Sequence, residues 1–332
     1  MTLLVALPSK GRLQEQTSAF LDRAGLPVRQ ARGARGYSGE IAGLSNAAVQ
    51  FRSAGEIARA VACGEAHLAV TGIDLLHETL GSPAADAADR DSTGPAHVVA
   101  RLGFGHADLV VAVPRAWIDV VTMADLADVA ARFRLRHHRP MRVATKYVGL
   151  TRRFLTDHGV SDYLIVESPG ATEGAPAAGS AEFIVDITST GRTLADNGLK
   201  ILENGTMLRS EAALVASLAA DWDDASLATA RSFLARISAD SRARKVKRID
   251  AALGGADEGL SEALRARFGA AVLSRGPALL SVLCPAPAVH DCAGWLIANG
   301  AATAVVSTPE SVFEAEDPLA RALADRLAGD RP

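Results

Sequence analysis

Short apolar segments that alternate with helical patterns constrain the fold of this chain more than any other feature. Residues 3–7, 108–113 and 183–187 are largely apolar runs of strand length, and each ends at a proline or a polar turn. Apolar residues at helical spacing follow the first two runs, over about residues 13–24 and 123–135. This alternation predicts α/β domains with parallel sheets, in which ligands bind at the carboxyl ends of the strands.

Length and charge narrow the function classes. The 332 residues allow two or three domains of about 100–150 residues each. The formal net charge is −3, and the most basic stretches, residues 132–139 and 242–248, are short enough to be solvated helix faces. Nucleic acid is therefore not an expected partner.

The cysteines and the N-terminus indicate an intracellular protein. Cys63, Cys284 and Cys292 lack metal-ligand spacing, which is typical of reduced thiols in the cytosol. A signal peptide would carry its positive charge before the apolar run, whereas Lys10 and Arg12 follow it. No stretch approaches the roughly 20 apolar residues of a membrane helix. We expect a cytoplasmic location and no contact with membranes.

The composition changes at about residue 222. Ala, Arg, Asp and Ser dominate up to about residue 252, which predicts one long helix. Residues 278–284 and 303–307 are strand-like and flank a helical pattern at 288–299. The C-terminal third therefore predicts a smaller α+β module.

The segment from Glu173 to Leu194 carries the clearest chemical pattern. Its apolar strand is followed by small hydroxyl residues and Gly191, which lead into a predicted helix. Free N–H groups and hydroxyls at such a turn suit a phosphate, and Asp186 could accept hydrogen bonds from ribose hydroxyls. The alternative interpretation is an ordinary strand-to-helix turn capped by Ser or Thr.

This segment resembles the signature of the ATP phosphoribosyltransferases, the family that catalyses the first step of histidine biosynthesis. The matching positions are Glu173, Gly179, Ala181, Ile184, Asp186, Thr190, Gly191, Thr193 and Leu194. Residues 7–13, 70–76, 144–152 and 167–173 resemble further segments of the same family, with Ser9 inserted and Val148 in place of a proline.

The resemblance implies a fold and a domain division. The expected α/β fold is a two-domain catalytic core of the type II periplasmic-binding-protein-like kind, with a smaller C-terminal α+β ferredoxin-like domain. Catalytic domain I would comprise residues 1–104 plus 196–221, and catalytic domain II, with the loop for phosphoribosyl pyrophosphate (PRPP), residues 105–195. Residues 222–332 would form a regulatory or oligomerisation domain.

The resemblance also implies a reaction and partners. N1 of the adenine of ATP would attack C1 of PRPP, giving N1-(5-phosphoribosyl)-ATP and pyrophosphate, with Mg²⁺ as cofactor. Charge develops on the leaving group, so cations and fixed dipoles should matter more than a general base. A homo-oligomer is expected, with a hexamer and a dimer both implied. Histidine is the expected inhibitor at residues 278–309, with a purely packing or oligomerising module as the alternative.

Site residues follow from the matched segments. Lys10, Arg12 and Asp186 are the candidate catalytic residues, and Mg²⁺ would be held through pyrophosphate, with Asp74 or Glu167 as candidate protein ligands. The candidates for PRPP binding are Glu173, Asp186, Ser189, Thr190, Gly191, Arg192 and Thr193. The candidates for ATP binding are Lys10, Gly11, Arg12, Arg52 and Asp74, with Arg35 as a further cation.

Purely structural roles are the alternative at these positions. Lys10 and Arg12 could be solvated loop cations, and Asp74 could be a turn-capping residue. Glu167 and Glu173 could each be a hydrogen-bonded loop carboxylate rather than a group that orients ribose hydroxyls or Mg²⁺. The family pattern Arg-x-x-Asp-Ile-Pro is replaced by Arg-Ser-Ala-Gly-Glu-Ile-Ala at residues 52–58, which puts the ATP contacts there in doubt.

Two other function classes compete with the enzyme. A periplasmic-binding-protein-like protein for an anion or solute could share the fold, but export would require a signal segment. A catalytically silent regulatory paralogue would be expected to lose signature residues, whereas the signature is complete.

Overall fold

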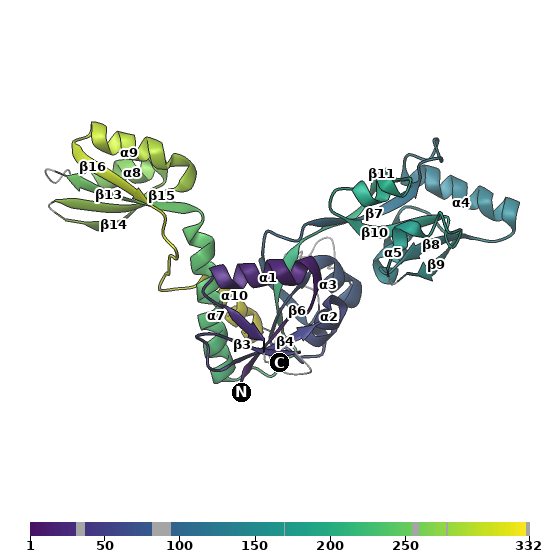
Figure 1. The fold of residues 1–332 in the computed structure, drawn as a ribbon, viewed down its shortest axis with the longest axis horizontal. Helices are drawn as coiled ribbons and strands as arrows, with labels where there is room; N and C mark the ends of the chain where they lie inside the picture. The colour runs from purple at the N-terminus through teal and green to yellow at the C-terminus, as the bar shows by residue number, and fades with distance from the viewer. Residues whose placement is uncertain (31–36, 82–93, 169, 254–258, 277, 330–332) are drawn as a thin grey trace.

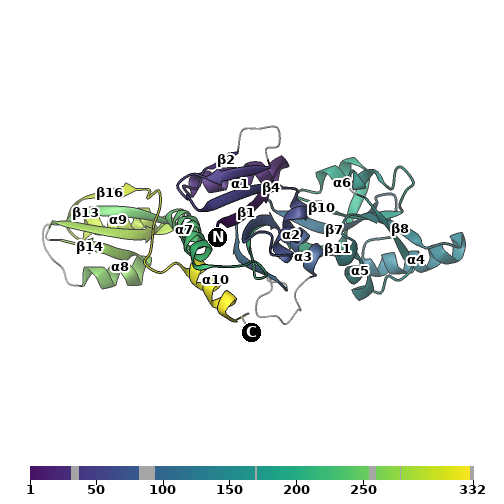
Figure 2. The ribbon, with the colours of Figure 1, turned by 90° about the horizontal axis from the view of Figure 1, so that it is seen from below.

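A computed structural model describes residues 1–30, 37–81, 94–168, 170–253, 259–276 and 278–329. Its strands form three separate sheets of seven, five and four strands. Figure 1 shows the corresponding three lobes, with the seven-stranded sheet in the central one, and Figure 2 shows them from below. Arg35 lies outside the described residues, so its predicted role has no structural counterpart here.

The first domain is built on the seven-stranded sheet, in the order β2-β3-β4-β1-β5-β12-β6. β1 is parallel to β4 and β5, whereas β12 is antiparallel to β5 and β6. The sheet is therefore mixed rather than parallel throughout. Its strands are β1 (Leu3–Pro8), β2 (Val28–Gln30), β3 (Ser38–Ile41), β4 (Ala47–Arg52), β5 (Leu68–Gly72), β6 (Ala96–Arg101) and β12 (Ala212–Ser217). Its early helices are α1 (Gly11–Arg23), α2 (Ala54–Ala62) and α3 (Ile73–Leu80).

Two later helices complete this domain. α7 (Asp224–Ala243) and α10 (Pro318–Gly329) lie side by side in the central lobe (Figures 1 and 2). Buried side chains of both helices, including Phe233 and Leu323, belong to the same core as β1 and β4. The structure thus differs from the predicted division at residue 222. Apolar residues along α7 bury against the first sheet, a packing that composition does not reveal.

The second domain is built on the five-stranded sheet, in the order β11-β7-β10-β8-β9. β10, β8 and β9 are parallel, and β7 runs antiparallel between β10 and β11. Its strands are β7 (Ala107–Pro114), β8 (Met141–Thr145), β9 (Tyr163–Glu167), β10 (Phe183–Thr188) and β11 (Leu199–Ser210). Its helices are α4 (Met123–His137), α5 (Val148–Asp157), the short 3₁₀ turn η1 (Thr172–Gly174) and α6 (Arg192–Asp196).

The chain crosses between these two domains twice. The first crossing joins β6 to β7, and the second joins β11 to β12 around Glu211. Two backbone hydrogen bonds join the crossings. The N–H of Leu102 donates to the carbonyl oxygen of Ala212, and the N–H of Ala212 donates to the carbonyl oxygen of Phe104. The second domain therefore extends to residue 210, whereas the sequence predicted its end at 195. β11 belongs to it because its residues pair with β7 from Leu199 at one end to Ser210 at the other, with two register shifts between them.

The third domain has the strand order β14-β15-β13-β16, all antiparallel. With two helices between the strands this is the βαββαβ arrangement of ferredoxin-like domains, as predicted. Its strands are β13 (Val246–Leu253), β14 (Ala271–Arg275), β15 (Leu279–Pro285) and β16 (Ala301–Ser307). Its helices are α8 (Leu260–Phe268), the short η2 (Ala286–Ala288) and α9 (Val289–Ala298).

One prediction was wrong at the entrance to this domain. The helix expected to reach residue 252 ends at Ala243, and β13 follows as an inner strand of the sheet. Ile249, Ala251 and Leu253 alternate with more exposed residues, which is the period of a half-buried strand. The charged residues Arg248 and Asp250 made the composition of this segment similar to that of the preceding helix, which hid the alternating pattern.

Candidate functional site

A cleft of about 630 Å³ lies between the first two domains. The first domain contributes Arg12 from α1 and Gly72 from the end of β5. The second domain contributes Lys146, which follows β8, and residues 187–189 at the end of β10. The crossing segment 103–107 closes one side. Cationic side chains from both domains and hydroxyl side chains from the second therefore line one open cleft, an arrangement suited to an anionic ligand.

The turn after β10 is built by its own hydroxyl groups. The side-chain oxygen of Thr188 accepts from the backbone N–H of Gly191 at 2.9 Å, and that of Thr190 from Arg192 at 3.4 Å. Gly191 has a φ of 71°, which favours glycine. The side chains of Ser189, Thr190 and Thr193 are exposed. α6 has only five residues. The N–H and hydroxyl groups of the turn, rather than the dipole of this short helix, are therefore the main donors available to an anion.

Asp186 is partly buried one strand away from Lys146. Burial raises the pKa of Asp186, and the nearby carboxylate of Glu173 raises it further. The backbone N–H of Ile187, which donates to Asp186 at 2.8 Å, and the ammonium of Lys146 lower this pKa. The charges of Glu173 and Lys146 therefore both act on Asp186, which lies beside the turn at residues 188–193, the hydroxyl turn.

Other PRPP candidates lie at the edges of this region. Arg192 is exposed and pairs with Asp196 across one helical turn at 3.8 Å, which is a weak surface pair. Glu167 ends β9 and is paired in register with Thr145 of β8. Its side chain is exposed, so it can reach a ligand only from the rim of the sheet.

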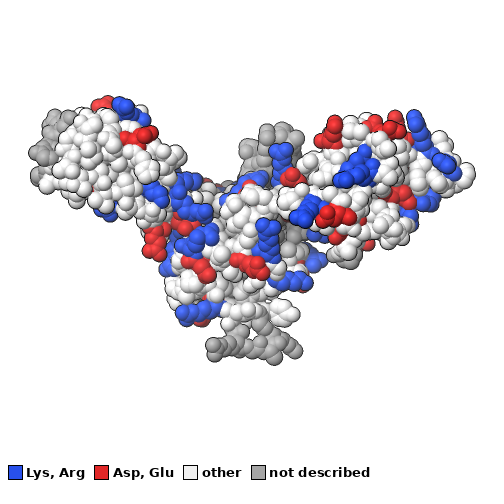
Figure 3. All heavy atoms as spheres, turned by 45° about the horizontal axis from the view of Figure 1, so that its top comes forward, with Lys and Arg blue, Asp and Glu red and all other residues white. Residues whose placement is uncertain are grey.

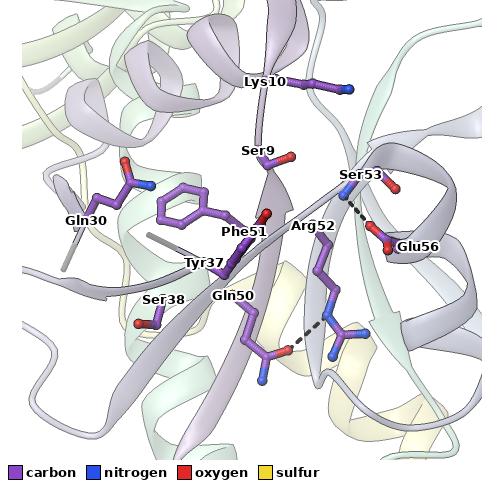
Figure 4. A pocket seen from close by; sticks show the side chains of 10 residues that line it. All are labelled: Ser9, Lys10, Gln30, Tyr37, Ser38, Gln50, Phe51, Arg52, Ser53 and Glu56. Atoms are coloured by element: carbon purple, nitrogen blue, oxygen red, sulfur yellow. Dashed lines mark hydrogen bonds between the residues drawn. The ribbon is translucent and has the colours of Figure 1, made fainter. Parts of the chain in front are cut away.

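A second cavity of about 1060 Å³ lies on the first domain, beside Lys10 (Figure 4). Arg52, at the end of β4, donates to Gln50 at 3.1 Å and to Glu65 at 2.6 Å. Ser53 and Glu56 form a capping box that begins α2, with Ser53 N–H donating to Glu56 at 2.8 Å. The departure from the family pattern at residues 52–58 thus has a helix-starting role.

Lys10 and Arg12 reach different cavities from one turn. Gly11 has a φ of 75°, so the chain turns sharply between β1 and α1. Lys10 lines the cavity on the first domain, and Arg12 lines the interdomain cleft. The face drawn in Figure 3 shows basic and acidic side chains interspersed rather than gathered into one basic patch. Local placement of these cations therefore matters more than overall charge.

Asp74 has protein partners for both carboxylate oxygens. Tyr147 donates to Oδ2 and Ser210 donates to Oδ1, each at 2.6 Å. Asp74 is 4% exposed, and its own backbone N–H donates to Ser210 at 3.0 Å. Burial and the Asp74 charge raise the pKa of Tyr147, which keeps the phenol protonated as the donor. Asp74 therefore lies at the floor of the cleft with its oxygens already engaged.

Sequence reasoning assigned no role to two residues of the cleft. Lys146 lies in a segment that resembled the family, and it follows a strand adjacent to β10, so the shared edge of the sheet could have identified it. Gln16 of α1 also lines the cleft, and its buried amide oxygen has no hydrogen-bond partner among the described residues. No local pattern signals that Gln16 faces the second domain.

Comparisons with known proteins identify the family of this chain. The family described as HisG: ATP phosphoribosyltransferase matches residues 53–239. An ATP phosphoribosyltransferase from Bradyrhizobium diazoefficiens is 51% identical over 319 residues, covering 95% of each chain. One from Afipia carboxidovorans is 50% identical over the same share of both chains. The chain belongs to the ATP phosphoribosyltransferase family.

The family membership carries the reaction and the fold. An ATP phosphoribosyltransferase joins ATP and PRPP in the first step of histidine biosynthesis, and this assignment confirms the predicted enzyme class. A solved ATP phosphoribosyltransferase (HisG:HisZ) complex from Thermotoga maritima matches 71% of this chain and 94% of that chain, with a TM-score of 0.50 and 24% identity. The two-domain α/β core shares its fold with that solved structure, and an additional C-terminal sheet domain follows it in this chain. No helix among the described residues of this phosphoribosyltransferase is long and apolar enough to cross a membrane.

Proposed function

We propose that the interdomain cleft is the site where PRPP reacts with ATP. The observation that carries this proposal is the convergence of Arg12 from one domain with Lys146 and Ser189 from the other. Two anionic substrates held between the domains would have their reacting atoms aligned and their charge neutralised by these cations. The reaction would then need no protein nucleophile.

The hydroxyl turn would bind the 5′-phosphate of PRPP. Ser189, Thr190 and Thr193 offer exposed hydroxyls, and the long 3.4 Å bond from Arg192 N–H to Thr190 could exchange for one to a phosphate oxygen. Gly191 allows close backbone approach, and Arg192 would add charge from the rim. Asp186, with Glu173 beside it, would accept hydrogen bonds from the ribose hydroxyls.

Lys10, Gly11 and Arg12 would serve the pyrophosphate and ATP. Arg12 can form bidentate contacts with phosphate oxygens, whereas Lys10 acts as a point charge at the mouth of the second cavity. Arg52 lines that cavity and would reach the triphosphate once its contact with Glu65 loosens. The free amide oxygen of Gln16 is suited to a ligand amino group in the cleft.

A divalent cation, which we take to be Mg²⁺, would enter with the pyrophosphate. No group of three or more His, Cys, Asp or Glu side chains among the described residues is arranged to hold a metal. Asp74 is saturated by hydroxyl donors, which leaves the exposed Glu167 as the available carboxylate of the two candidates. When bound, the cation would neutralise charge on the leaving pyrophosphate.

The third domain would serve regulation and assembly. We propose that histidine binds the β15–β16 region and inhibits the enzyme, and that the chain forms a homo-oligomer, a hexamer or a dimer, in the cytoplasm. The ferredoxin-like fold supports a module separate from the catalytic core. Calorimetric titration with histidine, and activity with and without it, would test this. Absence of both binding and inhibition would leave a packing or oligomerising module.

The test of the site uses Asp186→Ala and Thr190→Val. Formation of N1-substituted adenine changes the ultraviolet absorbance of a mixture of ATP, PRPP and Mg²⁺ with pyrophosphatase. Both variants should lose turnover while retaining the wild-type circular dichroism. Asp128→Ala on α4 and Thr156→Val on α5 are matched controls, because both side chains are exposed and neither lines the cleft. Near-normal kcat/KM in either site variant would refute the assignment.

A further inference from the structure

One helix of the first domain contacts the second domain through two carboxylates. Asp74 and Glu78 stand one turn apart on α3. Asp74 accepts the hydroxyl hydrogen of Tyr147 at 2.6 Å, and Glu78 accepts the backbone N–H groups of Gly149 and Leu150 at 2.8 and 2.9 Å. All three donors lie at the start of α5, so α3 holds one short segment of the other domain.

Glu78 acts as the N-terminal cap of a helix in the other domain. The N-cap residue of α5 is Tyr147, and it provides no side-chain cap. The N-terminal amides of a helix have no partner within the helix, so they require an external acceptor. Glu78 fills this role, and its negative charge is favourable at the positive end of α5. If the domains separated here, the N–H groups of Gly149 and Leu150 would lose Glu78 as their acceptor and would bond to water instead.

Asp74 adds the crossing segment to the same contact. Ser210, which donates to Asp74 at 2.6 Å, is the last residue of β11, where the chain returns to the first domain. Gly72 lies so close that a Cβ there would overlap the Asp74 carboxylate. The glycine of the Thr-Gly-Ile-Asp segment therefore permits the contact. One carboxylate thus joins the first domain, the second domain and the strand that links them.

The held segment also carries a cation of the cleft. Lys146 immediately precedes Tyr147, and its ammonium lies 4.9 Å from the centre of the Tyr147 ring. Tyr147 N–H donates to Thr145 at 2.9 Å, which fixes the turn between β8 and α5. Any shift of Tyr147 relative to α3 would therefore move Lys146, together with the rest of the second domain, relative to Arg12 of the first domain.

We propose that Asp74 and Glu78 form an interdomain clasp that holds the two halves of the cleft at the separation needed for Arg12 of the first domain to contact PRPP bound beside Lys146. The inference rests on the proposed function of the cleft. Asp74 and Glu78 are positioning residues in this scheme, and they act through Tyr147 and α5. The clasp assigns Asp74 a role other than binding substrate or metal.

The first experiment measures the cleft without substrate. Cys63 is exposed on the first domain, and Asp128→Cys adds a second label site on α4 of the second domain, while Cys284 and Cys292 are buried. Energy transfer between dyes on these two sites should give a narrow distance distribution in the otherwise unmodified protein. Tyr147→Phe and Glu78→Gln should each broaden it or shift it. Tyr163→Phe and Glu262→Gln, matched changes away from the clasp, should not.

The second experiment separates positioning from simple stability. Losing a hydrogen bond to a charged group should raise the KM for PRPP about tenfold in Tyr147→Phe and Glu78→Gln. kcat should stay within about twofold of the unmodified protein, and the melting temperature should be nearly unchanged. A lowered melting temperature with unchanged KM and unchanged dye distances would overturn the clasp. If the unmodified protein fails to bind PRPP, the proposed function fails, but the dye distances still decide whether the clasp exists.

Discussion

Arg142 donates from Nη2 to the backbone oxygen of Gly179 at 2.8 Å. Arg142 lies on β8, and Gly179 is part of the loop that precedes β10. The same guanidinium pairs with Glu182 at 2.8 Å, and Arg139 pairs with Glu182 at 2.9 Å. The loop before the hydroxyl turn is thereby fixed to the strand beside it.

Arg142→Gln should therefore weaken PRPP binding through the loop. Losing the Gly179 contact and part of the Glu182 pair frees the segment that carries Glu173, which raises the KM for PRPP about fivefold to tenfold. The KM for ATP should change little, because the loop is on the second domain. Steady-state kinetics with each substrate varied in turn would measure this. Arg136→Gln, an exposed change on α4, is the control, and equal increases in both KM values would contradict the local explanation.

The Glu182 ion pairs predict a loss of stability in acid. Burial raises the pKa of Glu182, but hydrogen bonds from Arg139 and Arg142 outweigh this and lower the pKa to about 2. A depressed pKa in the folded state means that stability is present above the unfolded pKa and is lost as pH falls towards the folded one. Stability should therefore decline from about pH 5 towards pH 2. Urea unfolding at several pH values should show a smaller decline in Glu182→Gln than in the unmodified protein.

The raised pKa of Asp186 predicts how the activity falls at acidic pH. Burial raises the pKa of Asp186, and Glu173 adds to this effect, so activity should fall with decreasing pH earlier than an ordinary aspartate would allow. Glu173→Gln should move this limb to lower pH. Lys146→Met should move it to higher pH, because the ammonium lowers the pKa of Asp186. Profiles of kcat/KM for PRPP would measure both shifts, and shifts in the same direction would contradict the assignment.

The burial of Phe233 predicts that α7 stabilises the first domain. Its side chain is fully buried in the core that includes β1 and β4. Phe233→Ala should reduce the free energy of unfolding of the first domain by about 3–5 kcal/mol. Phe313→Ala removes the same side chain at a position that is 62% exposed, and should cost no more than about 0.5 kcal/mol. Denaturant titration would compare them, and equal costs would mean that α7 is not part of this core.

Local patterns predicted the elements that carry the hydroxyl turn. Apolar residues 183–187 specify a buried strand, and the small residues after it specify a turn, because both follow from backbone sterics and short-range hydrogen bonds. The specific match from Glu173 to Leu194 then predicted the family, which the comparisons confirm. The roles given to the individual residues of this turn stay predictions.

Sequence patterns failed where two distant segments decide the outcome. β13 was mistaken for helix because its buried residues, Ile249, Ala251 and Leu253, alternate with charged and small ones. Pairing with β15 on one side and β16 on the other stabilises that segment as a strand. The assignment of α7 likewise depended on which sheet its apolar face meets.

The sequence by itself determined the family, the α/β elements and the hydroxyl turn, since each depends on residues close together in the chain. Only the tertiary structure decided the partners of Asp74, because Ser210 lies 136 residues away and Tyr147 lies 73 residues away. It also decided that Arg12 and Lys146 face one cleft. Contacts of this kind form only when separate domains pack, so residue type and local spacing do not reveal which side chains then meet.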